Sequence, residues 1–169
     1  MSLTMHSASV PVFSRLLGNM LGWLDRAEAH AKARNFDPTN YLGLRLAPDM
    51  LPLVRQIQIA SDGAKGCVSR LAGVEIPKWE DQEASLDDLR ARIRKTIDYV
   101  QSFDAARLDG SDSRAITVPM RSGDALQFNG ESFLKHFAMP NFYFHATTTY
   151  ALLRQAGVEL GKIDFLGRG

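Results

Sequence analysis

The chain has 169 residues, 45% of them hydrophobic and 23% charged, which is the balance of a soluble globular protein with one compact core. Twenty basic residues against nineteen acidic ones leave a net charge of +1, so the composition gives no sign of a nucleic-acid partner or a membrane partner. Cys67 is the single cysteine, so no disulfide forms within the chain. Without a recognisable secretory signal or membrane-spanning stretch, we expect a cytoplasmic protein.

Two long helices are expected in the first half of the chain. Over residues 9–35, apolar side chains recur at intervals of three and four residues, which predicts an amphipathic helix that begins near residue 7 or 9. A connector follows over residues 37–47, with a short helical turn predicted at 41–44. A second amphipathic helix is then predicted over residues 48–71.

The second helix carries polar residues on its apolar stripe. Gln58 and Asp62, one turn apart, interrupt the stripe, and Gly73 is expected to end the helix as a C-terminal glycine cap. A buried polar group without a partner costs roughly 1–3 kcal/mol. Gln58 and Asp62 therefore need partners elsewhere in the fold.

The middle of the chain predicts a loop, a third helix and a β-hairpin. Residues 74–84 have the composition of an ordered loop, and a capping-box pattern marks the start of a helix predicted over residues 85–102. Two short runs, residues 116–120 and 125–128, flank a turn and predict a hairpin. Because an isolated hairpin is only marginally stable, we expect it to pack on the helices.

The last helix carries the polar residues that define a candidate site. It is predicted over residues 131–156, with an interruption or kink at Pro140. Within it, His145 lies in line with Asn141 one turn before and Thr148 one turn after. Such a polar stripe on a core-facing helix indicates either a satisfied internal network or a binding site.

These elements together predict an all-α four-helix bundle, a single domain over residues 1–169 with a small β-hairpin between helices three and four. The tail of residues 161–166 is expected to dock back on the bundle through Phe165. Aromatic residues surround the last helix, which indicates core packing or a dimer interface. Tyr143 and Trp23 are the interface candidates if they prove to be exposed.

Six segments spread over nearly the whole chain carry a resemblance to a known family. They are residues 9–13 (Ser-Val-Pro-Val-Phe), 46–50 (Leu-Ala-Pro-Asp-Met), 56–62 (Gln-Ile-Gln-Ile-Ala-Ser-Asp), 70–73 (Arg-Leu-Ala-Gly), 140–145 (Pro-Asn-Phe-Tyr-Phe-His) and 161–167 (Gly-Lys-Ile-Asp-Phe-Leu-Gly). In this combination the chain resembles the uncharacterised family called domain of unknown function nineteen-ninety-three, within the DinB/YfiT-like metalloenzyme superfamily. The resemblance implies an up-down-down-up four-helix bundle, often paired as a homodimer.

The resemblance also implies where a site would lie. Typical DinB-like proteins hold a divalent metal, often Zn²⁺ or Ni²⁺, between one histidine of the second helix and a His-x-x-x-His pair of the last helix. His145, followed by Leu-Arg-x-x-Gly at residues 153–157, occupies the position of the second histidine of that pair, and Asn141 stands at the first. The middle of the second helix offers polar residues but no histidine: Gln56, Gln58, Ser61 and Asp62.

Three functions follow from these residues. The first is a small-molecule-binding or cryptic bundle, with Gln58, Asp62, Asn141 and Thr148 forming a polar pocket beside His145. The second is a Zn- or Ni-dependent transferase or hydrolase with His145, Asp62 and Asn141 as metal ligands, although amide oxygens are weak ligands for zinc. The third is a structural, dimerising, stress-associated protein. The predicted site requires Asp62, Asn141 and His145 to face one interior point.

Overall fold

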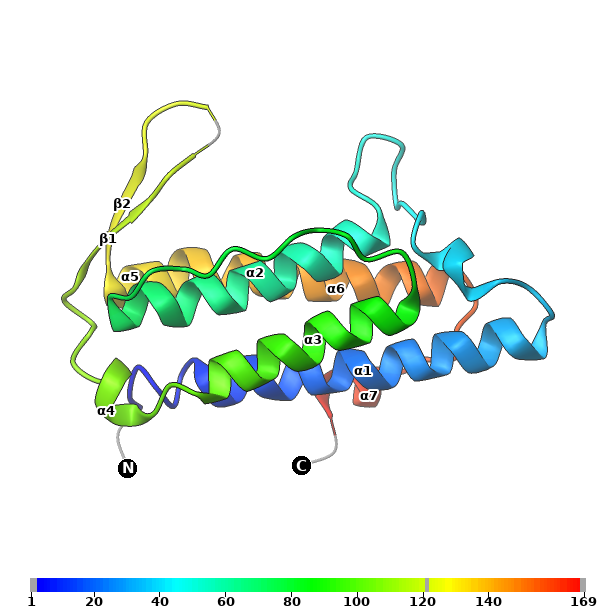
Figure 1. Ribbon diagram of the computed structural model, residues 1–169, viewed down its shortest axis with the longest axis horizontal. Coiled ribbons are helices and arrows are strands. Elements are labelled where there is room, and N and C mark those ends of the chain that lie inside the picture. The colour runs from blue at the N-terminus through cyan, green and yellow to red at the C-terminus, as the bar shows by residue number, and fades with distance from the viewer. Residues whose placement is uncertain (1–2, 121, 168–169) are drawn as a thin grey trace.

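A computed structural model describes residues 3–120 and 122–167 and shows an elongated helical bundle (Figure 1). Its long helices are α1 (Val10–Ala33), α2 (Leu53–Ala72), α3 (Leu86–Gln101) and α6 (Met139–Gln155). The colours of Figure 1 show that α1 and α6 run in one direction and that α2 and α3 run in the other. The predicted up-down-down-up bundle is therefore confirmed.

The parallel course of α2 and α3 requires a connection that returns along the length of the bundle. Residues 73–85, which we call the crossover, make this return without regular secondary structure (Figure 1). Gly73 begins the crossover with a φ of 70°, which confirms the predicted glycine cap of α2. At the other end, the Ser85 hydroxyl accepts a hydrogen bond from the Asp88 N–H at 3.1 Å and so caps α3.

The second helix begins later than the sequence predicts. It starts at Leu53, not at residue 48, because Pro52 precedes it in an extended conformation as its N-cap. The first amide groups of α2 bond to the connector instead, with the Leu53 N–H donating to the Leu44 carbonyl at 2.9 Å and the Val54 N–H to the Leu42 carbonyl at 3.2 Å. The short helical turn of this connector is η1 (Pro38–Tyr41), three residues earlier than predicted.

The predicted hairpin consists of β1 (Ala115–Val118) and β2 (Leu126–Asn129), paired in antiparallel register after the short helix α4 (Ala105–Leu108). The hairpin extends from one end of the bundle in Figure 1. Its base packs on the helical segment that follows, with the Phe128 and Phe133 ring centroids 6.0 Å apart. The expectation that the hairpin contacts the helices is therefore confirmed for its base.

The last helical segment is continuous but not uniform. It comprises α5 (Gly130–Phe133), a π-helical turn η2 (Leu134–Ala138) and then α6. Pro140 has no N–H to donate to the preceding turn and its ring crowds that turn, so a local widening accommodates it. The interruption predicted at Pro140 therefore takes the form of a π turn just before it. Gly157, with a φ of 92°, follows α6 and allows the chain to leave the helix.

The tail docks on the outside of α1, as predicted. It forms α7 (Lys162–Leu166), and its Phe165 ring stacks on Trp23 with the centroids 5.5 Å apart. The Trp23 indole N–H also donates to the Asp164 carbonyl at 2.9 Å. Inside the bundle, Phe13 of α1 meets Phe142 of α6 edge to face at 4.8 Å. None of the helices within the described ranges combines the length and the apolar character that a membrane span requires.

Candidate functional site

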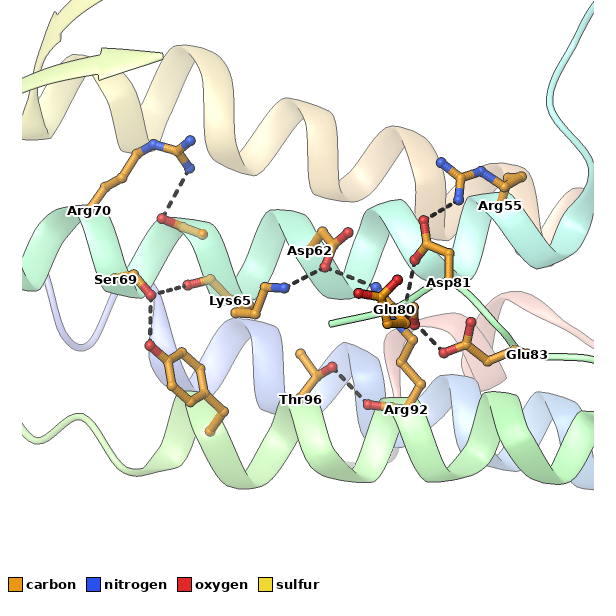
Figure 2. Close-up of polar contacts among 12 residues, drawn as sticks. Arg55, Asp62, Lys65, Ser69, Arg70, Glu80, Asp81, Glu83, Arg92 and Thr96 are labelled. Atoms are coloured by element: carbon orange, nitrogen blue, oxygen red, sulfur yellow. Dashed lines mark hydrogen bonds and ion pairs between the residues drawn. The ribbon is translucent and has the colours of Figure 1, made fainter. Parts of the chain in front are cut away.

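The predicted meeting of Asp62, Asn141 and His145 does not occur, and that expectation is wrong. Asp62 faces α3 and the crossover, where its Oδ1 accepts from Lys65 Nζ at 2.7 Å and from Arg92 Nη2 at 2.9 Å (Figure 2). His145 instead pairs with Gln56 of α2, with Nδ1 and Oε1 2.7 Å apart. Gln56 and Asp62 are six residues apart and so project about 120° apart around the helix. The two polar faces of α2 therefore serve different neighbours.

Asp62 belongs to a group of charged and polar side chains that holds the crossover against α2 and α3. We call this group the Arg92 cluster, and Figure 2 shows its ionic members converging from both helices and the crossover. Arg92 Nη1 donates to Asp81 Oδ1 at 2.9 Å and to Glu83 Oε1 at 3.0 Å, both on the crossover. The members of the Arg92 cluster are Arg55, Gln58, Asp62, Lys65, Asp81, Glu83 and Arg92.

Gln58, predicted as a pocket residue, is also fully engaged in the Arg92 cluster. Its amide Nε2 donates to Glu83 Oε2 at 2.6 Å, and its Oε1 accepts from Arg55 Nη1 at 2.7 Å. Like Asp62, it lies on the α3 side of the helix and away from His145. The structure therefore separates two of the four predicted pocket residues, Gln58 and Asp62, from the histidine that they were expected to surround.

The charges of the Arg92 cluster stabilise one another. The side chain of Arg92 is only 3% exposed, and this burial disfavours its positive charge. Glu83, Asp62 and Asp81 outweigh that effect and hold the pKa of Arg92 above its ordinary value. Burial likewise opposes ionisation of Asp81, but Arg55 and Arg92 together hold the pKa of Asp81 below its ordinary value. Each charged group is paired with an opposite charge inside the cluster, which is the arrangement expected of a network that stabilises the fold.

The pair of His145 and Gln56 is neutral, and its hydrogen bonds define which ring nitrogen carries the proton. Gln56 Nε2 donates to the Leu51 carbonyl at 2.9 Å. Because a carbonyl only accepts, the amide nitrogen of Gln56 must face Leu51, and its Oε1 must face the imidazole. Oε1 is also only an acceptor, so His145 Nδ1 carries the proton and donates it to Gln56. Nε2 is then left with a lone pair.

The environment of His145 keeps that imidazole uncharged. The residue is 8% exposed, and desolvation by burial lowers the pKa of His145 below its ordinary value. The ring is therefore neutral at pH 7. Nε2 has no hydrogen-bond partner in the described part of the chain. Since it is not fully buried, it retains contact with solvent. The site thus presents one open hydrogen-bond acceptor.

The other two predicted pocket residues lie on the same helix as His145 but do not bond to it. Thr148 donates its hydroxyl to the Phe144 carbonyl at 2.7 Å, a bond within α6. Asn141 lies against α2, where a Cβ added to Gly63 would come 3.4 Å from its Nδ2. Within residues 3–120 and 122–167 the Asn141 side chain makes no hydrogen bond. Its amide therefore remains free to meet a ligand.

A shallow groove of about 360 Å³ lies on the outer side of α6; His145 is not one of its lining residues, but its neighbour Phe144 is. The Phe144 ring forms part of its wall and meets the His145 ring edge to face, with centroids 5.2 Å apart. The wall also includes Leu46, from the same connector that supplies the Leu51 carbonyl to Gln56. The groove-lining residues are mainly apolar: Leu46, Tyr143, Phe144, Thr147, Thr148 and Ala151.

The exposed aromatic residues on this face bear on the expected homodimer. Tyr143 is 41% exposed and Phe144 is 56% exposed, so both satisfy the condition for an interface candidate. Trp23 does not, because it is 1% exposed and covered by the tail. The homodimer itself stays a prediction.

The residues around His145 do not fit a zinc or nickel site. Its neighbours on the two helices, Asn141 and Gln56, offer only neutral amide groups, and the Gln56 amide is engaged on both sides. Asp62, the carboxylate expected as a ligand, is held by Lys65 and Arg92. No group of three or more histidine, cysteine or acidic side chains within the described residues is arranged to hold a metal. Zinc and nickel sites need more imidazole, thiolate or carboxylate ligands than this.

Gln56 is the partner of His145 that sequence analysis missed. It was one of four polar residues in the middle of the second helix, and the expected site used Gln58 and Asp62 from that group. The available signal was spacing, because Gln56 and Gln58 are two residues apart, about 200° around a helix, and so belong to different faces. Only the packing of α6 on that face shows that Gln56 is the partner of His145.

Comparison with known proteins places this arrangement in a family. The family described as "Domain of unknown function (DUF1993)" matches residues 5–166. The crystal structure of a DinB family member protein from Shewanella denitrificans is similar, with 39% sequence identity, a TM-score of 0.87, and coverage of 97% of this chain and 92% of that chain. No curated protein matches the chain. The chain therefore belongs to the DUF1993 family and has the helical-bundle fold of a DinB family member.

Proposed function

We propose that this protein binds a small molecule at His145 and does so without a metal ion. The observation that carries the proposal is the ordered chain from the Leu51 carbonyl through Gln56 to His145 Nδ1, with distances of 2.9 and 2.7 Å. This chain leaves Nε2 of a neutral, nearly buried imidazole as an acceptor with no protein partner. Because Nε2 also keeps contact with solvent, a donor group of a ligand can reach it.

The surroundings define the chemistry of the ligand. The groove beside Phe144 is mainly apolar, so the ligand needs a small apolar or aromatic body. The open nitrogen requires a hydrogen-bond donor on that body, such as a hydroxyl or an amide N–H. Asn141 and Thr148, one turn to either side of His145, supply polar groups that can orient it. The class that fits is an uncharged aromatic or aliphatic molecule with one donor.

The metal-dependent transferase or hydrolase has less support, because the donor set described above lacks the ligands that zinc or nickel requires. The dimerising role has one specific observation in its favour, the exposure of Tyr143 and Phe144. A second copy seated there would cover the groove. Light scattering at micromolar concentration tests this alternative, since an obligate pair does not give the mass of a monomer.

A titration with phenol tests the proposal, because phenol combines an aromatic body with one donor. In ¹⁵N-labelled protein, saturable binding should shift the His145 Nε2 resonance together with the backbone amides of the groove residues Tyr143, Phe144 and Thr148, and His145→Phe should abolish those amide shifts. His136→Gln, which changes an exposed histidine nine residues earlier, is the matched control and should leave the titration unchanged. Zn²⁺ or Ni²⁺ retained at one ion per chain after dialysis, and lost in His145→Phe, would contradict a metal-free site.

A further inference from the structure

A second cavity, of about 490 Å³, lies at the end of the bundle where α4 and α5 are found in Figure 1. It is distant from Gln56, which lies near the first turn of α2 at the other end. Its volume is within the range of 300–1,000 Å³ that is typical of small-molecule sites. Neither the family nor the His145 site accounts for this cavity.

The cavity is lined by three parts of the chain, and its apolar side chains come from two of them. Leu3, Met5 and Ala8 belong to the segment before α1, and Leu134 and Met139 belong to the π-helical turn and the start of α6. A π-helical turn widens the helix locally and occurs frequently at functional sites. Here the turn supplies one wall of the cavity, so the distortion associated with Pro140 also shapes a place for a ligand.

The rim of the cavity is acidic. The charged groups among the described lining residues are the carboxylates of Asp109, Asp112 and Glu131 and the ammonium group of Lys135. Lys135 forms an ion pair with Glu131 one turn away. The formal charge of these described residues is therefore −2, from three negative groups and one positive group. A cationic ligand would meet an attractive potential here, and an anionic one would be repelled.

The rim is held in place by hydrogen bonds and by close packing of α5. The Glu131 N–H donates to the Asp112 carbonyl at 2.9 Å, and the His6 N–H donates to Asp109 Oδ1 at 3.0 Å. A Cβ on Gly130 would come 1.9 Å from the Ser111 carbonyl oxygen, so α5 packs directly on this loop.

We propose that this cavity binds an amphiphilic monocation, with the apolar body against Leu134 and Met139 and the ammonium group at the acidic rim. The apolar lining supplies affinity through burial of the ligand body. The carboxylates of Asp109 and Asp112 supply selectivity for positive charge, because Glu131 is already paired with Lys135. The ligand class is thus an alkyl- or arylammonium compound, distinct from the uncharged donor expected at His145.

Octylammonium is the probe, and octanol and octyl sulfate are its neutral and anionic counterparts. In two-dimensional amide NMR spectra of the full chain, octylammonium should bind most tightly and octyl sulfate most weakly. The shifted amides should include those of Met5, Ala8 and Leu134. Equal affinity for octanol and octylammonium, or shifts confined to the neighbours of His145, would overturn the proposal.

Two variants separate the charge from the cavity. Asp112→Asn should weaken octylammonium binding by roughly two- to fivefold, the range expected of one exposed charge pair, and should leave octanol binding unchanged. Asp98→Asn, an exposed acid on α3, is the matched control and should change neither. Ala8→Trp should fill the cavity and abolish binding of both probes; unchanged affinity in a folded Ala8→Trp protein would overturn the proposal. Should that variant fail to fold, the Asp112→Asn comparison decides. His145→Phe should have no effect on octylammonium.

Discussion

The two polar faces of α2 differ in their charge and in whether they leave a hydrogen-bonding group open to a ligand. The face toward α3 carries Asp62, whose carboxylate meets two cations, and the buried Arg92 beyond it meets three carboxylates. The face toward α6 carries Gln56, whose two hydrogen bonds leave the neutral ring of His145 with one open nitrogen. A network of paired charges holds the crossover on the helices, whereas a neutral pair with an unused acceptor can receive a ligand.

The contrast also explains how the long crossover is stabilised. The crossover has no regular secondary structure, so its position depends on side chains. Lys65 of α2 and Lys95 of α3 both lie over the Trp79 ring, at 4.3 and 4.5 Å from its centroid. Together with the Arg92 cluster, this contact connects the crossover to both parallel helices. The charged face of α2 thus has a structural task that the neutral face does not share.

The largest effect is expected from Arg92→Met, which breaks the charged face. It leaves Asp62, Asp81 and Glu83 without their shared cation. Because Asp62 and Asp81 are 42% and 35% exposed and keep Lys65 and Arg55, the cost should be about 3 kcal/mol, the lower end of the range for a broken buried pair. Urea denaturation measures the change in the free energy of unfolding. Arg94→Met, two residues away on α3 and exposed, is the control and should cost less than about 0.5 kcal/mol. Equal losses in the two variants would refute the structural role of the cluster.

Gln56→Leu removes the hydrogen bonds on the neutral face of α2 and should lower the free energy of unfolding by less than Arg92→Met does. It leaves the His145 Nδ1–H and the Leu51 carbonyl without partners, at a cost of about 1–3 kcal/mol in the free energy of unfolding. The double variant Gln56→Leu/His145→Phe removes both members of the pair, so it should cost less than the sum of the single variants. Strict additivity in this cycle, measured by urea denaturation, would show that the pair does not interact.

The pH dependence of stability tests the neutral state of His145. Burial lowers the pKa of His145 in the folded protein, so the unfolded chain binds this proton first as the pH falls. The stability from the neutral ring is fully present above the unfolded pKa of about 6.5 and is lost as the pH falls below it toward the folded pKa. The loss of stability between pH 7 and pH 5 should therefore be smaller in His145→Phe than in the wild type. The acidic residues titrate in both proteins, so the difference isolates His145.

Asp62→Asn is the substitution from which we expect the smallest loss in the free energy of unfolding. The amide oxygen can still accept one of the two hydrogen bonds, and the side chain is 42% exposed, so the loss should be about 0.5–1 kcal/mol. The ¹⁵N resonances of the His145 ring should not move, because Asp62 faces α3. A clear shift of those resonances would show that the two faces of α2 are coupled.

Much of this fold could be predicted from local patterns. The apolar stripes predict the four long helices, and Gly73 and Gly157 predict where two of them end, because only a positive φ there releases the last turn. The start of α2 could not be predicted as well. Whether residues 48–52 join the helix depends on the carbonyls of Leu42 and Leu44, which accept the first N–H groups of α2 from a distance of about ten residues.

The site was harder to predict for a geometric reason. The spacing of Asn141, His145 and Thr148 correctly predicts one face of α6, because all three lie on the same helix. The partner on α2 depends on which side of α2 faces α6, and α2 carries polar residues on both sides, Gln56 near its first turn and Asp62 near its middle. The parallel packing of α3 and the crossover assign Asp62 to the charged face. Contacts with other parts of the chain make that assignment, so no pattern within the second helix could predict it.

The most direct test of the account is the protonation of the His145 ring at pH 7, observed by ¹⁵N NMR. We predict that Nδ1 carries the proton, that Nε2 carries none, and that Gln56→Leu, but not Asp62→Asn, removes this preference. A proton on Nε2, a charged ring at pH 7, or a response to Asp62→Asn alone would contradict the assignment of His145 and Gln56 as a neutral site separate from the charged face of α2.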